Sequence, residues 1–70
     1  MTQTETETLT GYLATDARFH IGRYDRIVPA GTHITVELDD MESGRAIVLA
    51  RLASNPRICE YVYAAAIIPA

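Results

Sequence analysis

The amino-acid sequence predicts an all-β fold with at most one short helix, arranged as a small antiparallel barrel or roll of about five or six strands. Several short segments alternate apolar and polar residues, which is the pattern of a strand with one buried face. These segments are rich in β-branched and aromatic residues. Glycine, proline and aspartate separate them at short intervals. A length of 70 residues corresponds to one domain.

The chain begins with a polar and acidic stretch, M-T-Q-T-E-T-E-T, at residues 1–8. This stretch has nothing to bury, so we expect a flexible acidic arm. Residues 9–70 have a uniform composition without a linker or a repeat. They are therefore expected to form a single small β domain.

Two strands are expected at Leu9–Thr15 and Ala17–Tyr24, with Asp16 as the turn signal between them. We expect these strands to pair with each other as a hairpin. Alternation along the second strand places Ala17, Phe19 and Ile21 inward, and Arg18, His20 and Tyr24 outward. A short extended piece at Ile27 and Val28 follows.

The clearest strand runs from Thr32 to Leu38, after a turn that contains Pro29 and Gly31. Its β-branched content supports this prediction. One face carries Ile34, Val36 and Leu38, and the other carries His33, Thr35 and Glu37. Residues 39–44 are polar and include a glycine, so a connecting loop is expected there.

Two apolar segments complete the chain, Arg45–Leu52 and Ile58–Ile68. We interpret the first as a strand that closes a hairpin. A helix is the alternative, because Ser43 is a suitable N-cap and the pair at 55–56, Asn-Pro, would end it. The second segment is expected to be the final strand, ended by Pro69.

Both of these segments are apolar on both faces, whereas a strand in a small monomeric sheet needs only one apolar face. The additional face indicates a homo-oligomer or a heterologous protein partner. Tyrosines among apolar neighbours are typical of interfaces with hydrated edges. We therefore assign an oligomer interface to Ile47, Leu49, Cys59, Tyr61, Tyr63 and Ile67.

Five or six short strands in a chain of this length indicate a barrel or roll of the SH3-like or OB-like kind. An AbrB-like dimer with swapped hairpins is an alternative architecture. A folded monomer of this size buries only about 60% of the surface of its unfolded chain. Oligomerisation would add to that limited core, because the single cysteine excludes an internal disulfide.

The net charge of −3 argues against a general nucleic-acid binder. All six basic residues are arginine, which suits fixed bidentate contacts better than lysine does. The codon bias of a GC-rich genome is the alternative explanation. Apolar runs such as 64–68 are too short to span a membrane. The polar N-terminus does not resemble a signal peptide, so we expect a cytoplasmic protein with a reduced Cys59.

The chemistry-bearing residues do not form a recognisable catalytic, metal or cofactor motif. A nucleophile with a base would require Cys59 beside His20 or His33, but Cys59 lies in an apolar strand, where a thiol is normally inert. The histidines and the cysteine lack the spacing of metal ligands. The acidic cluster at 39–42 lacks the pattern of a calcium loop and is interpreted as a solvated hairpin tip.

The richest cluster of functional side chains is R-F-H-I-G-R-Y-D-R, at residues 18–26. Arginine and tyrosine are frequent interface hot spots, so this segment is a candidate site for a phosphate or an acidic protein surface. The predicted partner-binding residues are Arg18, His20, Arg23, Tyr24 and Arg26. In the alternative interpretation, the arginines pair with Asp16, Asp25 and Glu60, or with the acidic arm of a neighbouring subunit.

These features favour a small non-catalytic protein that docks onto a larger protein and modulates or inhibits it. In its general character the chain resembles the accessory proteins of phages and mobile elements. That resemblance implies a host protein, including a defence system, as the target. Two alternatives remain: an oligomer that binds a nucleotide or another anion between arginines, and a small dimeric nucleic-acid-binding regulator.

Overall fold

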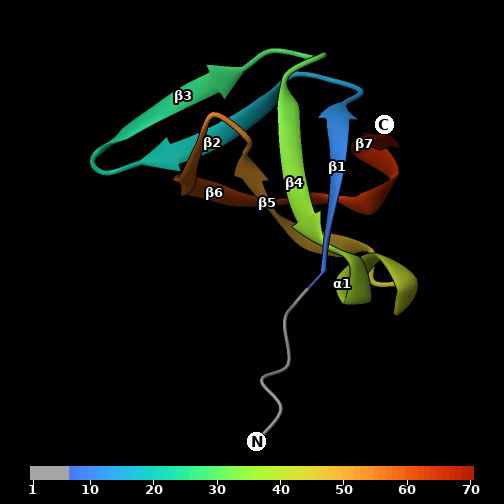
Figure 1. Cartoon of the computed structure of the whole chain (residues 1–70). Helices are drawn as coiled ribbons and strands as arrows, with labels where there is room; N and C mark the ends of the chain where they lie inside the picture. The colour runs from blue at the N-terminus through green and yellow to red at the C-terminus, as the bar shows by residue number, and fades with distance from the viewer. Residues whose placement is uncertain (1–6) are drawn as a thin grey trace, which may run out of the picture.

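The computed structural model describes residues 7–70, which fold into antiparallel β-structure with one short α-helix (Figure 1). The strands are β1 (Thr8–Leu13), β2 (Ala17–Ile21), β3 (Tyr24–Val28), β4 (His33–Glu37), β5 (Ile47–Leu52), β6 (Asn55–Tyr63) and β7 (Ile67–Pro69). The α-helix is α1 (Leu38–Glu42), and a 3-10 turn, η1 (Ala64–Ala66), precedes β7. The predicted class, mostly β with one short helix, is confirmed.

The strands form two sheets. A five-stranded sheet has the order β6-β5-β4-β1-β7, and β2 and β3 form a separate two-stranded hairpin. β1 lies inside the larger sheet, paired with β4 on one side and with β7 on the other. Strands from both ends of the chain are therefore neighbours, and β6 and β7 are the two edges.

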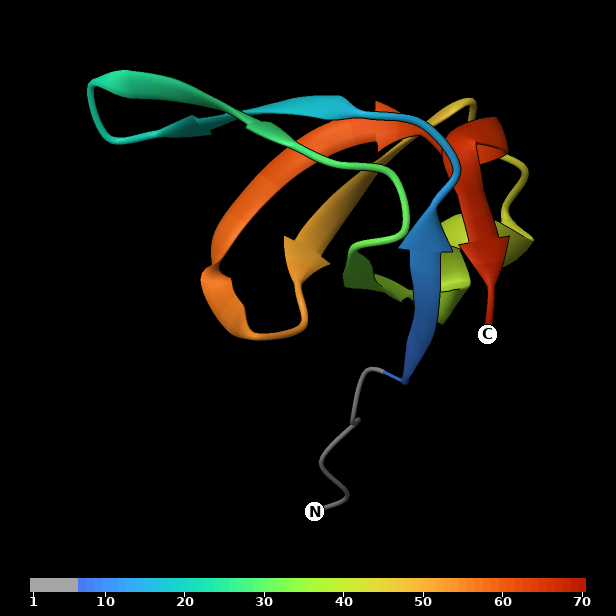
Figure 2. The ribbon, with the colours of Figure 1, turned by 90° about the horizontal axis from the view of Figure 1, so that it is seen from above.

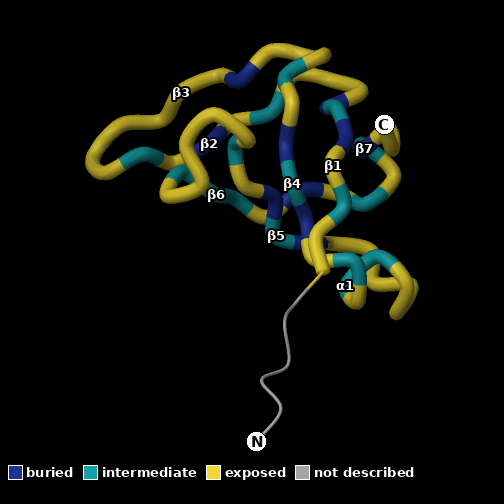
Figure 3. Tube along the Cα trace, in the orientation of Figure 1, coloured by how far each residue is buried: buried dark blue, intermediate teal, exposed yellow. Residues whose placement is uncertain are grey.

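The core lies between the inner face of the larger sheet and the base of the hairpin (Figure 3). It is entirely apolar within the described residues. Its members are Leu13, Phe19, Val28, Ile34, Val36, Val48, Ala50, Val62 and Ile67. Phe19, with 0% exposure, is the largest of these side chains and joins β2 to the larger sheet. The predicted inward orientation of Phe19, Ile34 and Val36 is confirmed.

The predicted hairpin between Leu9–Thr15 and Ala17–Tyr24 is wrong. β2 pairs instead with β3, and the two-residue loop Gly22–Arg23 connects them. Gly22 has φ 61°, and no other residue type in the described chain has a positive φ. This is the pattern of a type II′ turn, which matches the twist of paired strands. The predicted second strand therefore ends before Gly22, at Ile21, and Tyr24 begins the next strand.

The segment at 45–52 is a strand, as predicted, and begins at Ile47. The helix lies earlier, at α1, where a polar loop was expected. Two acidic residues occupy the first turn of α1, where they interact favourably with the helix dipole. Ser43 ends the helix: its backbone N–H bonds to Asp39 O at 2.9 Å and its hydroxyl to Asp40 O at 2.8 Å.

The predicted final strand at 58–68 is divided. β6 ends at Tyr63, and η1 redirects the chain so that β7 pairs with β1. The backbone of β7 passes so close to Gly11 that a Cβ atom at this position would lie 2.7 Å from Ile68 O. Glycine in the middle of a strand allows this close approach. Residues beyond Tyr63 therefore do not continue the two faces of β6.

The N-terminal boundary of the domain also differs from the prediction. Thr8 belongs to β1 and pairs with Glu37, and the Leu38 N–H donates to Glu7 O at 2.9 Å. The predicted arm of residues 1–8 therefore extends too far along the chain. The rest of that prediction, residues 1–6, lies outside the described residues.

Candidate functional site

The β2–β3 hairpin extends beyond the larger sheet, with its tip at Gly22–Arg23 (Figures 1 and 2). Its base is fixed by Phe19 and Val28 in the core. β2 also contacts β6, where the Glu60 carboxylate accepts the backbone N–H of His20 at 3.2 Å. The hairpin is thus anchored at one end and exposed at the other.

All predicted partner-binding residues lie on this hairpin and are exposed: Arg18, His20, Arg23, Tyr24 and Arg26. They do not share one face, contrary to the prediction for Arg18, His20 and Tyr24. Arg26 is the cross-strand partner of Phe19, and Tyr24 shares its side because side chains alternate along a strand. Arg18 and His20 point to the opposite side. The prediction failed because it placed Tyr24 on the same strand as Arg18.

The side of the hairpin that carries Tyr24 and Arg26 borders a groove of about 410 Å³. Ile21 and Asp25 of the hairpin and Ile58 of β6 complete its lining. Tyr24 is 77% exposed, which is high for an aromatic side chain. The groove combines apolar walls with an arginine, an arrangement that suits an apolar anchor flanked by a carboxylate.

The carboxylates near these arginines have other partners. Asp16 Oδ1 accepts the Ala30 N–H at 2.8 Å, and Asp25 Oδ1 lies 2.6 Å from His20 Nδ1. Glu60 binds the backbone of the hairpin. Within residues 7–70 no arginine forms an ion pair with a carboxylate. Pairing of the arginines with these three residues, the alternative interpretation, is therefore not observed.

The histidines and the cysteine occupy separate positions. Cys59 is half-buried and lies opposite Arg51 in the β5–β6 pair. The His20 ring bonds to Asp25 on the hairpin. The His33 ring packs edge-on against the aromatic ring of Tyr12, with centroids 4.5 Å apart. Each histidine ring thus has a partner other than the thiol, and in the described part of the chain no three His, Cys, Asp or Glu side chains form a metal-binding group.

The predicted interface residues gather on the outer face of β5 and β6, with one exception. Ile47 pairs with Tyr63, and Leu49 pairs with Tyr61. Ile47 is 50%, Tyr61 66% and Tyr63 68% exposed. Leu49 is half-buried on the same face. These four adjacent side chains form an exposed apolar patch, which we call the outer patch.

Ile67 is the exception, because it lies in the core and is 6% exposed. Its assignment to the same face as Tyr63 assumed one continuous strand. The 3-10 turn at η1 interrupts the alternation of side chains after Tyr63. It directs Ile67 to the inner face of β7, opposite Leu13. Cys59, in contrast, lies on the outer face of β6, beside Tyr61 in the alternation.

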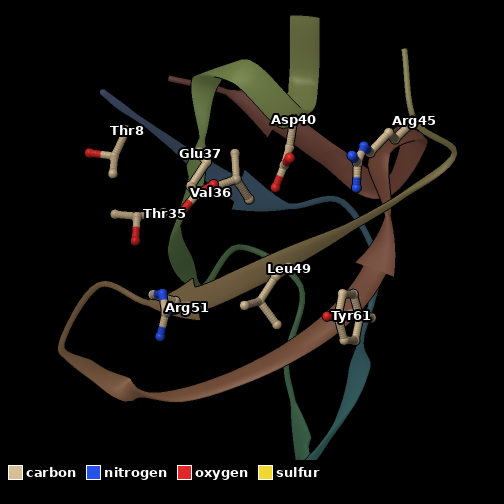
Figure 4. A pocket seen from close by; sticks show the side chains of 9 residues that line it. All are labelled: Thr8, Thr35, Val36, Glu37, Asp40, Arg45, Leu49, Arg51 and Tyr61. Carbon is tan, nitrogen blue, oxygen red and sulfur yellow. The ribbon is translucent and has the colours of Figure 1, made fainter. Parts of the chain in front are cut away.

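A cavity of about 200 Å³ adjoins the outer patch (Figure 4). Its lining residues are Thr8, Thr35, Val36, Glu37, Asp40, Arg45, Leu49, Arg51 and Tyr61. Glu37 and Asp40 come from β4 and α1, whereas Arg51 lies near the end of β5 and Arg45 lies two residues before its start. The cavity therefore contains both signs of charge beside apolar side chains. Sequence analysis missed it, although alternation placed Glu37 on the outward face of its strand.

Comparison with known proteins found no matching family model, and no significant match among curated proteins or solved structures. Across residues 7–70, no helix combines the length and the apolar character needed to cross a membrane.

Proposed function

We propose that this protein is a non-catalytic binding module that docks onto a larger protein through its β2–β3 hairpin. One observation carries the proposal: the hairpin presents three exposed arginines that have no carboxylate partner within residues 7–70, and one of them, Arg26, lines a largely apolar groove. Arginine and tyrosine are enriched among the few hot-spot residues that dominate binding energy at protein interfaces. The partner surface that fits is acidic and carries an apolar side chain for the groove.

An SH3-like architecture is the finer fold that we propose. Its support is the connection of the strands: a hairpin follows the first strand, three strands follow in sequence, and a 3-10 turn leads to a last strand beside the first. The Glu60 contact with β2 holds the hairpin against β6, across the gap between the two sheets. In this architecture the hairpin is free to contact a partner.

The protein modulates or inhibits its partner by covering the partner's acidic surface, without any catalytic step. This role fits an accessory protein of a phage or mobile element acting on a host protein, a defence system included. We place the interaction in the cytoplasm, because a single half-buried cysteine is compatible with a reducing compartment.

The test compares two charge-reversal variants in affinity capture from a cytosolic extract, with mass spectrometry of the captured proteins. Arg23→Glu/Arg26→Glu should lose the partner that the wild type captures, with affinity lowered by at least roughly 30-fold, the equivalent of about 2 kcal/mol. Arg57→Glu is the matched control, since Arg57 is an exposed arginine of β6 outside the hairpin. Retention of the same partner by the double variant would refute the hairpin as the docking surface.

A further inference from the structure

The structure assigns a second binding surface, distinct from the hairpin: we propose that the outer face of β4, β5 and β6 binds a second copy of this chain across a two-fold axis. The axis lies between Glu37 and Arg51, so that Arg51 of each copy faces Glu37 of the other. The outer patch surrounds this pair of contacts.

The first argument is the apolar content of the outer face. Three large side chains of the outer patch, Ile47, Tyr61 and Tyr63, are at least half exposed in the monomer. They are neighbours in the β5–β6 register rather than scattered. Contiguous exposed apolar side chains on a soluble protein mark an interaction surface. The opposite face of the same strands already packs against the core.

The second argument is charge, and it selects a second copy as the occupant. Glu37 and Arg51 lie on adjacent strands, because Arg51 pairs with Thr35, two residues before Glu37. They line the same cavity and are both exposed, yet they form no ion pair with each other. A two-fold interface sets a surface against its own rotated image. A surface with adjacent cation and anion is complementary to that image.

The remaining donors of Arg51 also favour this arrangement. One guanidinium nitrogen, Nη1, donates to Pro56 O at 3.2 Å, which fixes the side chain along the β5–β6 turn. An arginine has further N–H donors in a planar fork that suits a carboxylate. A purely anionic small molecule is a poor alternative occupant, because Glu37 and Asp40 also line the cavity and would repel it.

The two surfaces are compatible with each other. The hairpin arginines are not among the residues that line the cavity, so a dimer built on the outer face presents two free hairpins. Two linked sites on one particle bind a multivalent or clustered partner more tightly than one site does. The dimer does not require the proposed docking function, and its test uses purified protein alone.

The first measurement is the mass of the wild type by light scattering across micromolar concentrations. We expect twice the monomer mass of 7.7 kDa, with dissociation on dilution. Arg23→Glu, at the hairpin tip, is the control and should remain dimeric. This control separates the two proposals, since the same substitution contributes to the loss of partner docking.

The second measurement uses two complementary charge reversals, Arg51→Glu and Glu37→Arg. Each variant alone places like charges opposite each other at both contacts, so its dimer Kd should rise by at least roughly tenfold. In an equimolar mixture both contacts again join opposite charges. We expect the mixture to recover the dimer mass. A role of either residue within its own chain cannot produce this recovery.

Circular dichroism establishes that each variant is folded. Should Glu37→Arg fail to fold, Glu37→Gln replaces it, and its mixture with Arg51→Glu should still associate more tightly than Arg51→Glu alone. A wild type that stays monomeric at millimolar concentration overturns the proposal and leaves the face to a heterologous partner. A dimer that tolerates both reversals, or variants that do not recover on mixing, overturns it as well.

Discussion

Replacing Phe19 with alanine tests whether the hairpin depends on one buried side chain. Phe19 is fully buried, and the described core contains only nine buried side chains. Truncation of a buried phenylalanine to alanine costs about 3–5 kcal/mol. A chain of 70 residues has a total stability of about 4–10 kcal/mol. The substitution therefore removes a large fraction of the free energy of unfolding.

The assay is urea denaturation followed by circular dichroism. We expect a lower midpoint with an unchanged slope, because the hairpin and the sheet share one core and unfold together. The melting temperature should fall by more than about 12 °C, taking roughly 4 °C for each kcal/mol in a domain of this size. Phe19→Leu, which keeps most of the apolar volume, should cost less than about 1.5 kcal/mol.

Ile27→Ala is the matched control on the same hairpin. Ile27 is 55% exposed and pairs with Arg18, on the side away from Phe19. Its loss should change stability by no more than about 0.5 kcal/mol. The reasoning is refuted if Phe19→Ala costs less than about 1.5 kcal/mol or no more than the control. In that case the hairpin would be anchored by other contacts.

Two further substitutions test contacts between strands. Gly11→Ala should destabilise the protein by about 1–3 kcal/mol, because its Cβ would lie 2.7 Å from Ile68 O. The amides of β7 should then exchange their hydrogens faster than those of the other strands. Unchanged exchange in β7 would contradict this. Glu60→Ala should lower the free energy of unfolding by about 1 kcal/mol, because it removes the acceptor of the His20 N–H. Hydrogen exchange of that amide should become faster. Glu60→Gln keeps an acceptor oxygen and should cost less.

Local patterns predicted the strands better than their partners. The alternation of residues 32–38 identified β4 nearly to its ends, because both its buried positions and its β-branched residues point to the same structure. The faces of β5 were also correct, with Val48 and Ala50 buried and Ile47 exposed. Such patterns report which side of a strand is buried. They contain no information on which distant strand lies beside it.

The pairing errors have identifiable causes. The predicted strand Ala17–Tyr24 includes Gly22, whereas the structure places this glycine in a two-residue loop, where it fits a II′ turn. Gly11, in the middle of a strand, is a sequence signal for the close approach of another backbone, here that of β7. The break after Tyr63 has no comparable local signal, because alanines fit a strand and a 3-10 turn alike.

In the candidate site too, the sequence predicts the faces of the strands but not the contacts between distant strands. Five of the six predicted interface residues lie on the outer face, since alternation alone fixes the faces of β5 and β6. The sequence did not predict that Glu37 and Arg51 line one cavity, because only the β4–β5 register brings these two residues together. The hairpin residues were identified as exposed, but their distribution over two sides depended on the turn at Gly22.

The position of β1 inside the sheet determines the order in which the structure can assemble. β1 is the first strand of the described chain, and one of its two neighbours is β7, the last. The β5–β6 hairpin can form from adjacent residues, whereas the β1–β7 pair must close a loop of almost the whole domain, at a high entropic cost. Folding dominated by such distant contacts is slow, on the order of milliseconds to seconds. Until β7 arrives, one edge of β1 stays unpaired, and the nascent chain is open to pairing with other strands.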